Sequence, residues 1–347
     1  MTITINTRIL SYPITGLQRY LLELLSRIPS DHVRQIAPRH PLRGDRAHLW
    51  EQTVLPLRTR GDLLWSPSNT GPLTVSRQVV TLHDVLPMDH PEWVKPRFAA
   101  WNRFLTPKLA RRVARVITDS EFTKSRILEM TGVGEDKVVV VPLGVDVRFG
   151  PQSKEDVESA IHQLELPTNR YVLSLGSLVS RKNLGRLLRA WEVIYRSLPE
   201  DVWLVVSGAK VKSLVFQDVP ELEALPPRVF FTGHVPDELL PFLYAGAMTF
   251  AFLSVYEGFG LPPLEAMASG TPTLVGNRTS LPEVVGDGAV QVDPYDIEAI
   301  ADGLSRLIMD DSLRLVLRQK GLERAALFNW DKAAEQTWRV LTEAAED

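Results

Sequence analysis

The sequence predicts two doubly wound parallel α/β domains, and three observations support this prediction. Short β-branched runs alternate with longer amphipathic stretches along most of the chain, which is typical of strand and helix units in parallel sheets. Residues 146–168 interrupt the alternation with proline, glycine and charged residues, so a linker is expected near 147–155. The length of 347 residues also fits two domains of roughly 100 to 200 residues each.

The predicted elements form two series. Strands of the first are expected at 2–6, 79–82, 115–118 and 137–141, with helices at 16–28 and 120–130; strands of the second are expected at 171–176, 202–208, 228–233, 249–254 and 271–276, with helices at 183–198, 238–246 and 262–270. After about residue 295, helical spacing dominates. We therefore expect an N-terminal domain at 1–150, a second domain at 151–330, and a C-terminal helix at 331–347 that crosses back to the first domain.

The composition excludes several classes of protein. The chain is 44% hydrophobic and 23% charged, as expected for a soluble protein with a large core. It contains no cysteine, which excludes disulfides, thiolate nucleophiles and iron–sulfur clusters. It has no basic start followed by an apolar stretch and no uncharged apolar run of membrane-spanning length, so a cytoplasmic location is expected.

Charge is distributed unevenly along the chain. Residues 1–150 contain 21 basic and 14 acidic residues, whereas the remainder contains 18 basic and 28 acidic residues. A basic first half suggests that this half faces an anionic surface.

Two cations stand at a predicted strand-to-helix turn. The strand ends at Leu175, and Arg181 and Lys182 directly precede a helix expected to begin near Asn183. A helix N-terminus already favours negative charge, so cations placed there suit a diphosphate. The alternative is a solvated basic pair that the helix dipole would disfavour.

Two carboxylates flank a second helix start. The loop from Tyr256 to Leu261 is bracketed by glycines, and the helix that follows begins with two prolines, which suit a first turn. Glu257 precedes this helix and Glu265 lies within it, so both can contact one ligand at different depths. Glu265 also has a structural alternative, since an acid near a helix start complements the dipole, but nothing local requires an acid at 257.

These two elements together resemble the retaining glycosyltransferases of family 4. The resemblance is carried by Arg181-Lys182-Asn183 and by the E-x7-E spacing from Glu257 to Glu265. Supporting matches occur in the same order along nearly the whole chain, at Thr15–Tyr20, Thr81–Val85, Thr118–Phe122, Val141–Asp146, Thr232–Val235 and Ser280–Val284. The resemblance implies the GT-B fold, in which two Rossmann-like domains face a central cleft.

The resemblance also implies roles for individual residues. Arg181 and Lys182 would neutralise the diphosphate of a sugar nucleotide, Glu265 would hold the ribose hydroxyls, and Glu257 would bind hydroxyls of the donor sugar. Gly16 corresponds to the family's N-terminal glycine loop, although many relatives carry a second glycine there. Catalytic roles are expected for Glu257, His83, Arg181 and Lys182, with His83 and Asp84 on the acceptor side. The expected donor-binding set is Gly16, Arg181, Lys182, Val235, Glu257, Gly258, Phe259, Gly260, Leu261 and Glu265.

The expected reaction needs no metal. Negative charge grows on the departing diphosphate, and fixed cations and helix N–H groups can stabilise it. The sequence contains neither Asp-x-Asp nor HExxH, so no metal site and no cofactor other than the sugar-nucleotide co-substrate are expected. Retention of configuration can proceed through a covalent carboxylate intermediate or by same-face attack, and the family resemblance favours the second.

The donor prediction rests on similarity. The stretch at 81–93 resembles bacterial transferases that build surface polysaccharides, many of which use GDP-mannose. A UDP- or dTDP-sugar is the alternative donor. The base pocket is expected to involve the loop after Ser207 and residues near Val235.

A basic segment marks a surface of the first domain. Residues 97–118 contain six basic residues and no acid, interleaved with Phe98, Trp101 and Phe104. Such a segment is typical of a membrane-surface helix, and the alternative is a core helix with a solvated basic face. The family resemblance implies a glycan or lipid-linked acceptor. Together with the basic first half, this favours contact with the inner face of the cytoplasmic membrane, and nucleic-acid binding is not expected.

Other classes of function fit the sequence less well. No strand is followed by G-x-G-x-x-G and a helix, as a dinucleotide-dependent oxidoreductase would need. The G-x-S-x-G elbow of a hydrolase is also absent. A non-catalytic nucleotide-sugar-binding protein remains the alternative of another class.

Overall fold

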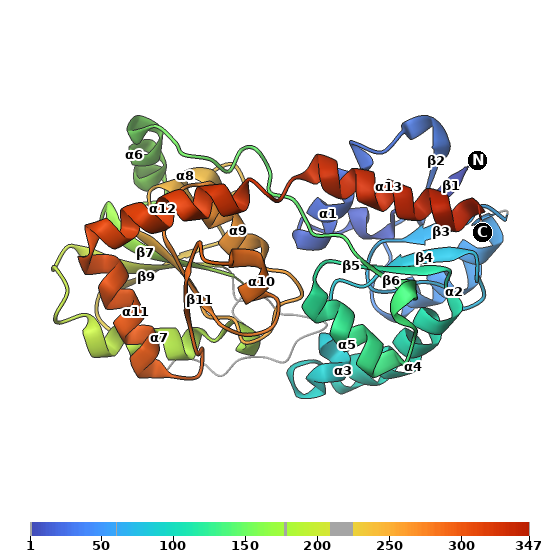
Figure 1. The fold of residues 1–347 in the computed structure, drawn as a ribbon, viewed down its shortest axis with the longest axis horizontal. Helices are drawn as coiled ribbons and strands as arrows, with labels where there is room; N and C mark the ends of the chain where they lie inside the picture. The colour runs from blue at the N-terminus through green and yellow to red at the C-terminus, as the bar shows by residue number, and fades with distance from the viewer. Residues whose placement is uncertain (1, 60, 177–178, 209–224, 347) are drawn as a thin grey trace. The chain divides into compact units, whose positions relative to one another are not determined.

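The computed structural model describes residues 2–59, 61–176, 179–208 and 225–346 and divides into two compact units (Figure 1). Unit 1 comprises Met1–Gly144 and Asn329–Asp347, and unit 2 comprises Val145–Phe328. In its described residues, each unit contains a six-stranded parallel sheet with helices on both faces. The doubly wound α/β prediction is confirmed.

Unit 1 is built around a sheet in the order β2-β1-β3-β4-β5-β6. Its elements are β1 (Ile3–Asn6), α1 (Gly16–Leu25), β2 (Val33–Ile36), α2 (Asp45–Thr59), β3 (Leu63–Ser66), β4 (Gln78–Thr81), α3 (Leu86–Asp89), α4 (Pro96–Arg112), β5 (Arg115–Thr118), α5 (Glu121–Thr131), β6 (Val138–Val140) and α13 (Trp330–Glu346), with short 3-10 turns at Arg8–Ser11, Ser30–His32, Pro91–Trp93 and Glu135–Lys137. All strand pairs are parallel.

Apolar side chains bury both faces of this sheet. On one face, Val80 and Val116 pack with Leu109 of α4 and Ile127 of α5, and α2 covers the neighbouring part through Leu55. On the other face, α13 packs against α1 and contacts β3, β4 and β5 (Figure 1). The C-terminal helix therefore completes the core of unit 1.

Unit 2 repeats this plan with the order β12-β11-β10-β7-β8-β9. Its elements are α6 (Lys154–Gln163), β7 (Arg170–Leu175), a 3-10 turn (Ser180–Lys182), α7 (Leu184–Ile194), β8 (Val202–Ser207), β9 (Val229–Gly233), α8 (Leu240–Ala245), β10 (Thr249–Phe252), α9 (Leu261–Ala268), β11 (Thr273–Gly276), α10 (Leu281–Val285), β12 (Val290–Val292), α11 (Ile297–Met309) and α12 (Asp311–Ala325). Apolar residues of α7 recur at helical spacing, and Leu188 and Trp191 pack with Leu304 of α11 in one buried cluster.

Each sheet has one switch point, which is the position where two neighbouring strands are followed by connections that run in opposite directions across the sheet. In unit 1, β1 lies between β2 and β3, so connections from β1 and β3 leave in opposite directions. In unit 2, β7 has β8 on one side and β10 on the other. Open α/β sheets bind ligands outside the carboxyl ends of the strands at such points, so these two edges are where binding residues are expected.

Three strands were not expected from the sequence. β3 is four residues long and buried on both faces, and so short an apolar run has no diagnostic periodicity. β2 lies at the sheet edge and carries Arg34 and Gln35, and β12 has only three residues. These three strands form because they pair with neighbouring strands, and their own sequences show only a weak strand pattern.

The basic segment at 97–118 is not one continuous helix. α4 ends at Arg112, and Arg115 begins β5. The basic helix therefore covers only the part of the segment up to Arg112, and the strand expected at 115–118 is confirmed as β5, which pairs with β4 and β6. Among the described helices, none is long and apolar enough to cross a membrane.

A substitution at Gly144 tests how closely α13 packs in unit 1. A Cβ atom at this position would lie 2.3 Å from the backbone nitrogen of Trp330, so we expect Gly144→Ala to lower the free energy of unfolding by about 1–3 kcal/mol through overpacking. Gly150→Ala is the matched control, because nothing lies within 4 Å of its Cβ position. Urea unfolding of both variants measures the difference, and equal midpoints would contradict the close packing.

Candidate active site

The turn after β7 is tied to the segment after β10. The backbone oxygen of Arg181 accepts hydrogen bonds from the Val255 amide at 2.8 Å and from Ser254 Oγ at 3.0 Å. Asn183 adopts a left-handed conformation before α7, and its Nδ2 donates to the oxygen of Pro294 at 2.6 Å. The carboxyl ends of β7 and β10, which flank the switch point of this sheet, are therefore joined.

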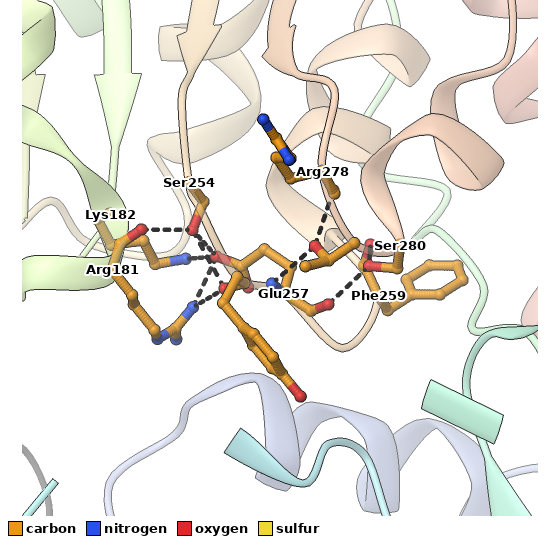
Figure 2. Close-up of polar contacts among 9 residues, drawn as sticks. Arg181, Lys182, Ser254, Glu257, Phe259, Arg278 and Ser280 are labelled. Atoms are coloured by element: carbon orange, nitrogen blue, oxygen red, sulfur yellow. Dashed lines mark hydrogen bonds and ion pairs between the residues drawn. The ribbon is translucent and has the colours of Figure 1, made fainter. Parts of the chain in front are cut away.

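Both cations of this turn contact Glu257 (Figure 2). Its Oε1 accepts from an Arg181 guanidinium nitrogen and from Lys182 Nζ, each at 2.6 Å, and from Ser254 Oγ at 2.5 Å. The three charged side chains are only 11–20% exposed. One carboxylate thus orients two cations and leaves a net positive charge, which suits a diphosphate.

Burial changes the acid–base properties of this group. Desolvation lowers the pKa of Lys182 to about 8, although Glu257 opposes this change. Burial alone would raise the pKa of Glu257, but the charges of Arg181 and Lys182 outweigh it and hold that pKa below its usual range. At neutral pH all three groups are charged, and an added anion would stabilise the protonated form of Lys182.

The loop at 258–261 is held by side-chain hydrogen bonds. Ser280 Oγ donates to the backbone oxygens of Phe259 at 2.7 Å and Glu257 at 2.9 Å, and Thr279 Oγ1 accepts from the Glu257 amide at 3.1 Å (Figure 2). Gly260 precedes α9 with a φ of +120°, which strongly favours glycine. The loop between Gly258 and Leu261 therefore has a defined shape at the start of α9.

Glu265 lies deeper in unit 2 than Glu257. It is the fifth residue of α9, beyond the first turn, and 6% exposed. Tyr244 donates its hydroxyl to Glu265 Oε2 at 3.0 Å. A dipole-complementing role is therefore weaker than the sequence suggested, and a specific partner orients the carboxylate.

The expected base pocket is only partly described. Val235 is buried, with 4% exposure, in the segment between β9 and α8. Residues 209–224 of the loop after Ser207 lie outside the described residues. The role of Val235 in donor binding stays a prediction.

His83 forms a buried ion pair in unit 1. Its Nδ1 lies 2.7 Å from Asp119 Oδ2, and its Nε2 lies 3.0 Å from the oxygen of Pro67. The oxygen of Pro67 can only accept, so Nε2 donates to it, and Nδ1 faces a carboxyl oxygen of Asp119. Burial lowers the pKa of His83, but Asp119 and Pro67 outweigh it and raise the pKa above its usual value. Because both ring nitrogens are engaged in these contacts, neither is free to act as a base.

The other unit 1 candidates have local structural partners. Asp84 Oδ1 accepts from the Leu86 amide at 3.0 Å, which forms a local turn directly before α3. Gly16 is exposed and is the first residue of α1, and the Thr15 amide donates to Gln18 Oε1 at 2.9 Å. Gly16, His83 and Asp84 belong to unit 1 and the remaining candidates to unit 2, so their joint action on one ligand stays a prediction.

Sequence reasoning assigned no role to several residues of these groups. Ser254, Tyr244 and Asp119 each contact a candidate side chain. Ser254 and Asp119 follow strand ends, β10 and β5, on the edges where ligands bind, and this position was the available signal. Tyr244 has no such signal, because its contact depends on how α8 packs against α9.

Comparison with known proteins identifies the family. Residues 156–324 match glycosyl transferases group 1, and residues 63–149 match glycosyltransferase family 4. The chain is 31% identical over 97% of its length to O-antigen chain mannosyltransferase B of Escherichia coli, and covers 98% of that protein. The chain belongs to glycosyltransferase family 4. The family expected from the Arg181-Lys182 turn and the Glu257–Glu265 spacing is confirmed.

Other relatives and structures agree with this glycosyltransferase assignment. The chain is 34% identical over 73% of its length to the MMP alpha-(1->4)-mannosyltransferase of Mycolicibacterium hassiacum, and covers 60% of it. The structure of Anabaena HepE has a TM-score of 0.76 at 19% identity, and that of WaaG a TM-score of 0.71 at 18%. Both alignments cover 99% of this chain and 100% of the solved chain. These structures confirm the GT-B fold.

Membership establishes the class of enzyme. The chain is a glycosyltransferase, and enzymes of this group use a nucleotide-sugar co-substrate and generally need no metal. Within the part of the chain that the structure describes, no three His, Asp or Glu side chains form a metal-ligand group.

The His83–Asp119 pair predicts a pH dependence of stability. The pKa of His83 is raised on folding, so the native state binds the imidazole proton more tightly than the unfolded state does. The stability that this proton contributes is complete below about pH 6.5 and is lost as the pH rises through the raised pKa. We expect Asp119→Asn to lower the free energy of unfolding at pH 6 by about 3–5 kcal/mol and to flatten the pH profile.

Urea unfolding at pH 6 and at pH 9 measures this effect. His40→Asn is the control, since His40 is exposed, and its profile should match that of the unaltered protein. If Asp119→Asn lowers the free energy of unfolding by the same amount at both pH values, the raised pKa of His83 is contradicted.

Proposed function

We propose that this glycosyltransferase transfers mannose, with retention, from GDP-mannose to a glycan or lipid-linked acceptor in surface polysaccharide biosynthesis. The observation that carries the proposal is the convergence of Arg181, Lys182 and Ser254 on Glu257 at the switch point of unit 2. The choice of mannose is supported by the names of the similar proteins of Escherichia coli and Mycolicibacterium hassiacum.

The charges of the site suit breakage of the bond between the anomeric carbon and the diphosphate. In this proposal, Arg181 and Lys182 stabilise the negative charge that develops on the leaving group. An acceptor hydroxyl attacks the anomeric carbon from the same face, and its proton passes to the departing phosphate oxygen. This step needs no metal and no protein base.

Glu257 has two roles in this proposal. Before donor binding, its Oε1 aligns both cations. When a diphosphate engages those cations, the carboxylate is available to hydroxyls of the donor sugar. Glu265, oriented by Tyr244, binds the ribose hydroxyls.

The donor is tested by thermal unfolding with EDTA present, against GDP-, UDP-, dTDP- and ADP-sugars and their free nucleotides. At one hundred times its dissociation constant, a ligand adds about 2.7 kcal/mol of stability. We expect stabilisation by GDP and GDP-mannose, weakening above pH 8 as Lys182 loses its proton. Stabilisation by UDP or dTDP compounds instead would favour the alternative donors.

Glu257→Gln separates a catalyst from a non-catalytic nucleotide-sugar-binding protein. The amide oxygen still accepts from both cations, so GDP affinity should stay within about threefold, whereas turnover should fall by about 100-fold or more. Radiolabelled mannose transfer to a membrane extract and GDP titration provide the two measurements. Glu298→Gln, at an exposed site on α11, is the control. Unchanged turnover in Glu257→Gln would contradict the proposed role.

Contact with the inner face of the cytoplasmic membrane is part of the proposal. α4 exposes Arg97, Arg103, Lys108, Arg111 and Arg112 together with Phe104, which is 49% exposed. Basic side chains near an anionic surface contribute about 1 kcal/mol each. This face suits an enzyme whose acceptor is lipid-linked.

Vesicle co-sedimentation tests the contact. We expect binding to phosphatidylglycerol vesicles at low salt that Arg103→Ala weakens about fivefold, in line with about 1 kcal/mol per charge. Lys332→Ala removes an exposed charge from α13 and should have no effect. Equal binding by both variants, or binding to neutral vesicles alone, would place the membrane contact elsewhere.

A further inference from the structure

Ser254 lies among three oxygen atoms that accept hydrogen bonds. It follows β10 and is fully buried. Its Oγ lies 2.5 Å from Glu257 Oε1, 3.0 Å from the backbone oxygen of Arg181 and 3.3 Å from that of Tyr256 (Figure 2). A serine hydroxyl carries one proton, so it donates to one of these oxygens at a time. Rotation about the Cβ–Oγ bond exchanges the acceptor without moving a heavy atom.

The shortest of these three contacts is the one to Glu257. Burial opposes ionisation of this carboxyl group, but the charges of Arg181 and Lys182 hold its pKa below its usual range, so it is ionised at neutral pH. A separation of 2.5 Å between a hydroxyl and a carboxylate oxygen is typical of a charge-assisted hydrogen bond, which is stronger than a neutral one. Without a ligand, the Ser254 hydroxyl therefore donates to Glu257 and reinforces its contacts with the two cations.

The two cations have other partners besides this carboxylate. Arg181 also donates from its guanidinium group to the backbone oxygen of Tyr256 at 3.0 Å. Lys182 Nζ lies 4.4 Å from the centre of the Phe252 ring, which is close enough for a cation–π contact. Departure of the Glu257 side chain therefore leaves each cation with a contact that holds it near the end of β7.

The backbone of Glu257 is fixed independently of its side chain. Its backbone oxygen accepts from Ser280 Oγ at 2.9 Å, and its amide donates to Thr279 Oγ1 at 3.1 Å. Neither bond involves the carboxylate. Rotation about the side-chain bonds alone can therefore carry the carboxylate away from the cations, while the loop before α9 keeps its shape.

We propose that Ser254 is a positioning residue that holds Glu257 against the cations in the ligand-free enzyme and turns its hydroxyl to the Arg181 oxygen when a diphosphate displaces the carboxylate. The Arg181 oxygen already accepts from the Val255 amide at 2.8 Å, and its second lone pair can accept from the hydroxyl. Release of Glu257 therefore leaves no buried donor unpaired. The inference rests on the proposed function, because the diphosphate is that of the donor.

Loss of the hydroxyl should strengthen diphosphate binding. In the unaltered protein, a diphosphate makes Ser254 exchange a charge-assisted hydrogen bond for a weaker neutral one, whereas Ser254→Ala has neither bond. We expect this variant to bind inorganic pyrophosphate and GDP about fivefold more tightly, which corresponds to about 1 kcal/mol. The KM for GDP-mannose should fall as well, while kcat stays within about twofold, because the stronger of the lost bonds belongs to the ligand-free state. Isothermal titration calorimetry with EDTA present measures the two affinities.

Thr249→Val is the matched control. Thr249 is fully buried at the other end of β10, and its hydroxyl donates to the backbone oxygen of Pro272 at 2.8 Å. This variant also loses a buried hydroxyl, so its stability should fall while its affinities for pyrophosphate and GDP stay unchanged. If Ser254→Ala fails to fold, Ser254→Cys, which keeps only a weak S–H donor, replaces it and should also bind pyrophosphate more tightly.

Unchanged or weaker pyrophosphate binding by Ser254→Ala would overturn the role of Ser254, since a purely structural hydroxyl gives that result. The turnover of Glu257→Gln reports on the proposed function separately. If that turnover is lost while Ser254→Ala binds pyrophosphate no more tightly, the inference about Ser254 fails and the proposed function stands. If Ser254→Ala binds pyrophosphate more tightly and Glu257→Gln keeps its turnover, the proposed function fails and the exchange at Ser254 stands.

Discussion

The convergence of two cations on Glu257 is the interaction on which the candidate active site depends. Arg181 and Lys182 sit close together in a buried setting, where their mutual repulsion would otherwise be large. The carboxylate offsets that repulsion and holds both groups at the end of β7. Because Glu257 and Ser254 follow β10, the same contacts join the two strands that flank the switch point. A diphosphate that replaces the carboxylate would meet donors already in place.

Parallel sheets explain why the polar groups of each unit gather at one edge. Every strand of such a sheet ends on the same side, so the residues after the strands are neighbours whatever their separation in sequence. In unit 2 this edge concentrates positive charge around one acid. In unit 1 it holds the buried His83–Asp119 pair and a charge-balanced group around Arg8 and Glu51. The two edges therefore differ in charge, since two cations share one carboxylate in unit 2 whereas Arg8 and Glu51 balance in unit 1.

Much of the fold and part of the site could be predicted from the sequence. The long amphipathic helices and the β-branched strands were identifiable because their periodicity is local. Arg181, Lys182 and Glu257 were identifiable because each stands near a strand end or helix start, and Glu265 was identifiable from its spacing to Glu257. β3 was missed because three apolar residues followed by a serine carry no periodicity, and Arg8 was missed because nothing near it in sequence indicates a buried partner.

The sequence by itself determined the family, the strand-and-helix alternation and the pair of cations in the turn after β7, since these depend on local spacing. Only the tertiary structure decided which side chains are paired. It joined His83 to Asp119, it gave Glu265 a partner in Tyr244, and it brought Arg8 and Glu51 together. Such contacts link distant segments, so only the packing of helices against a sheet can create them.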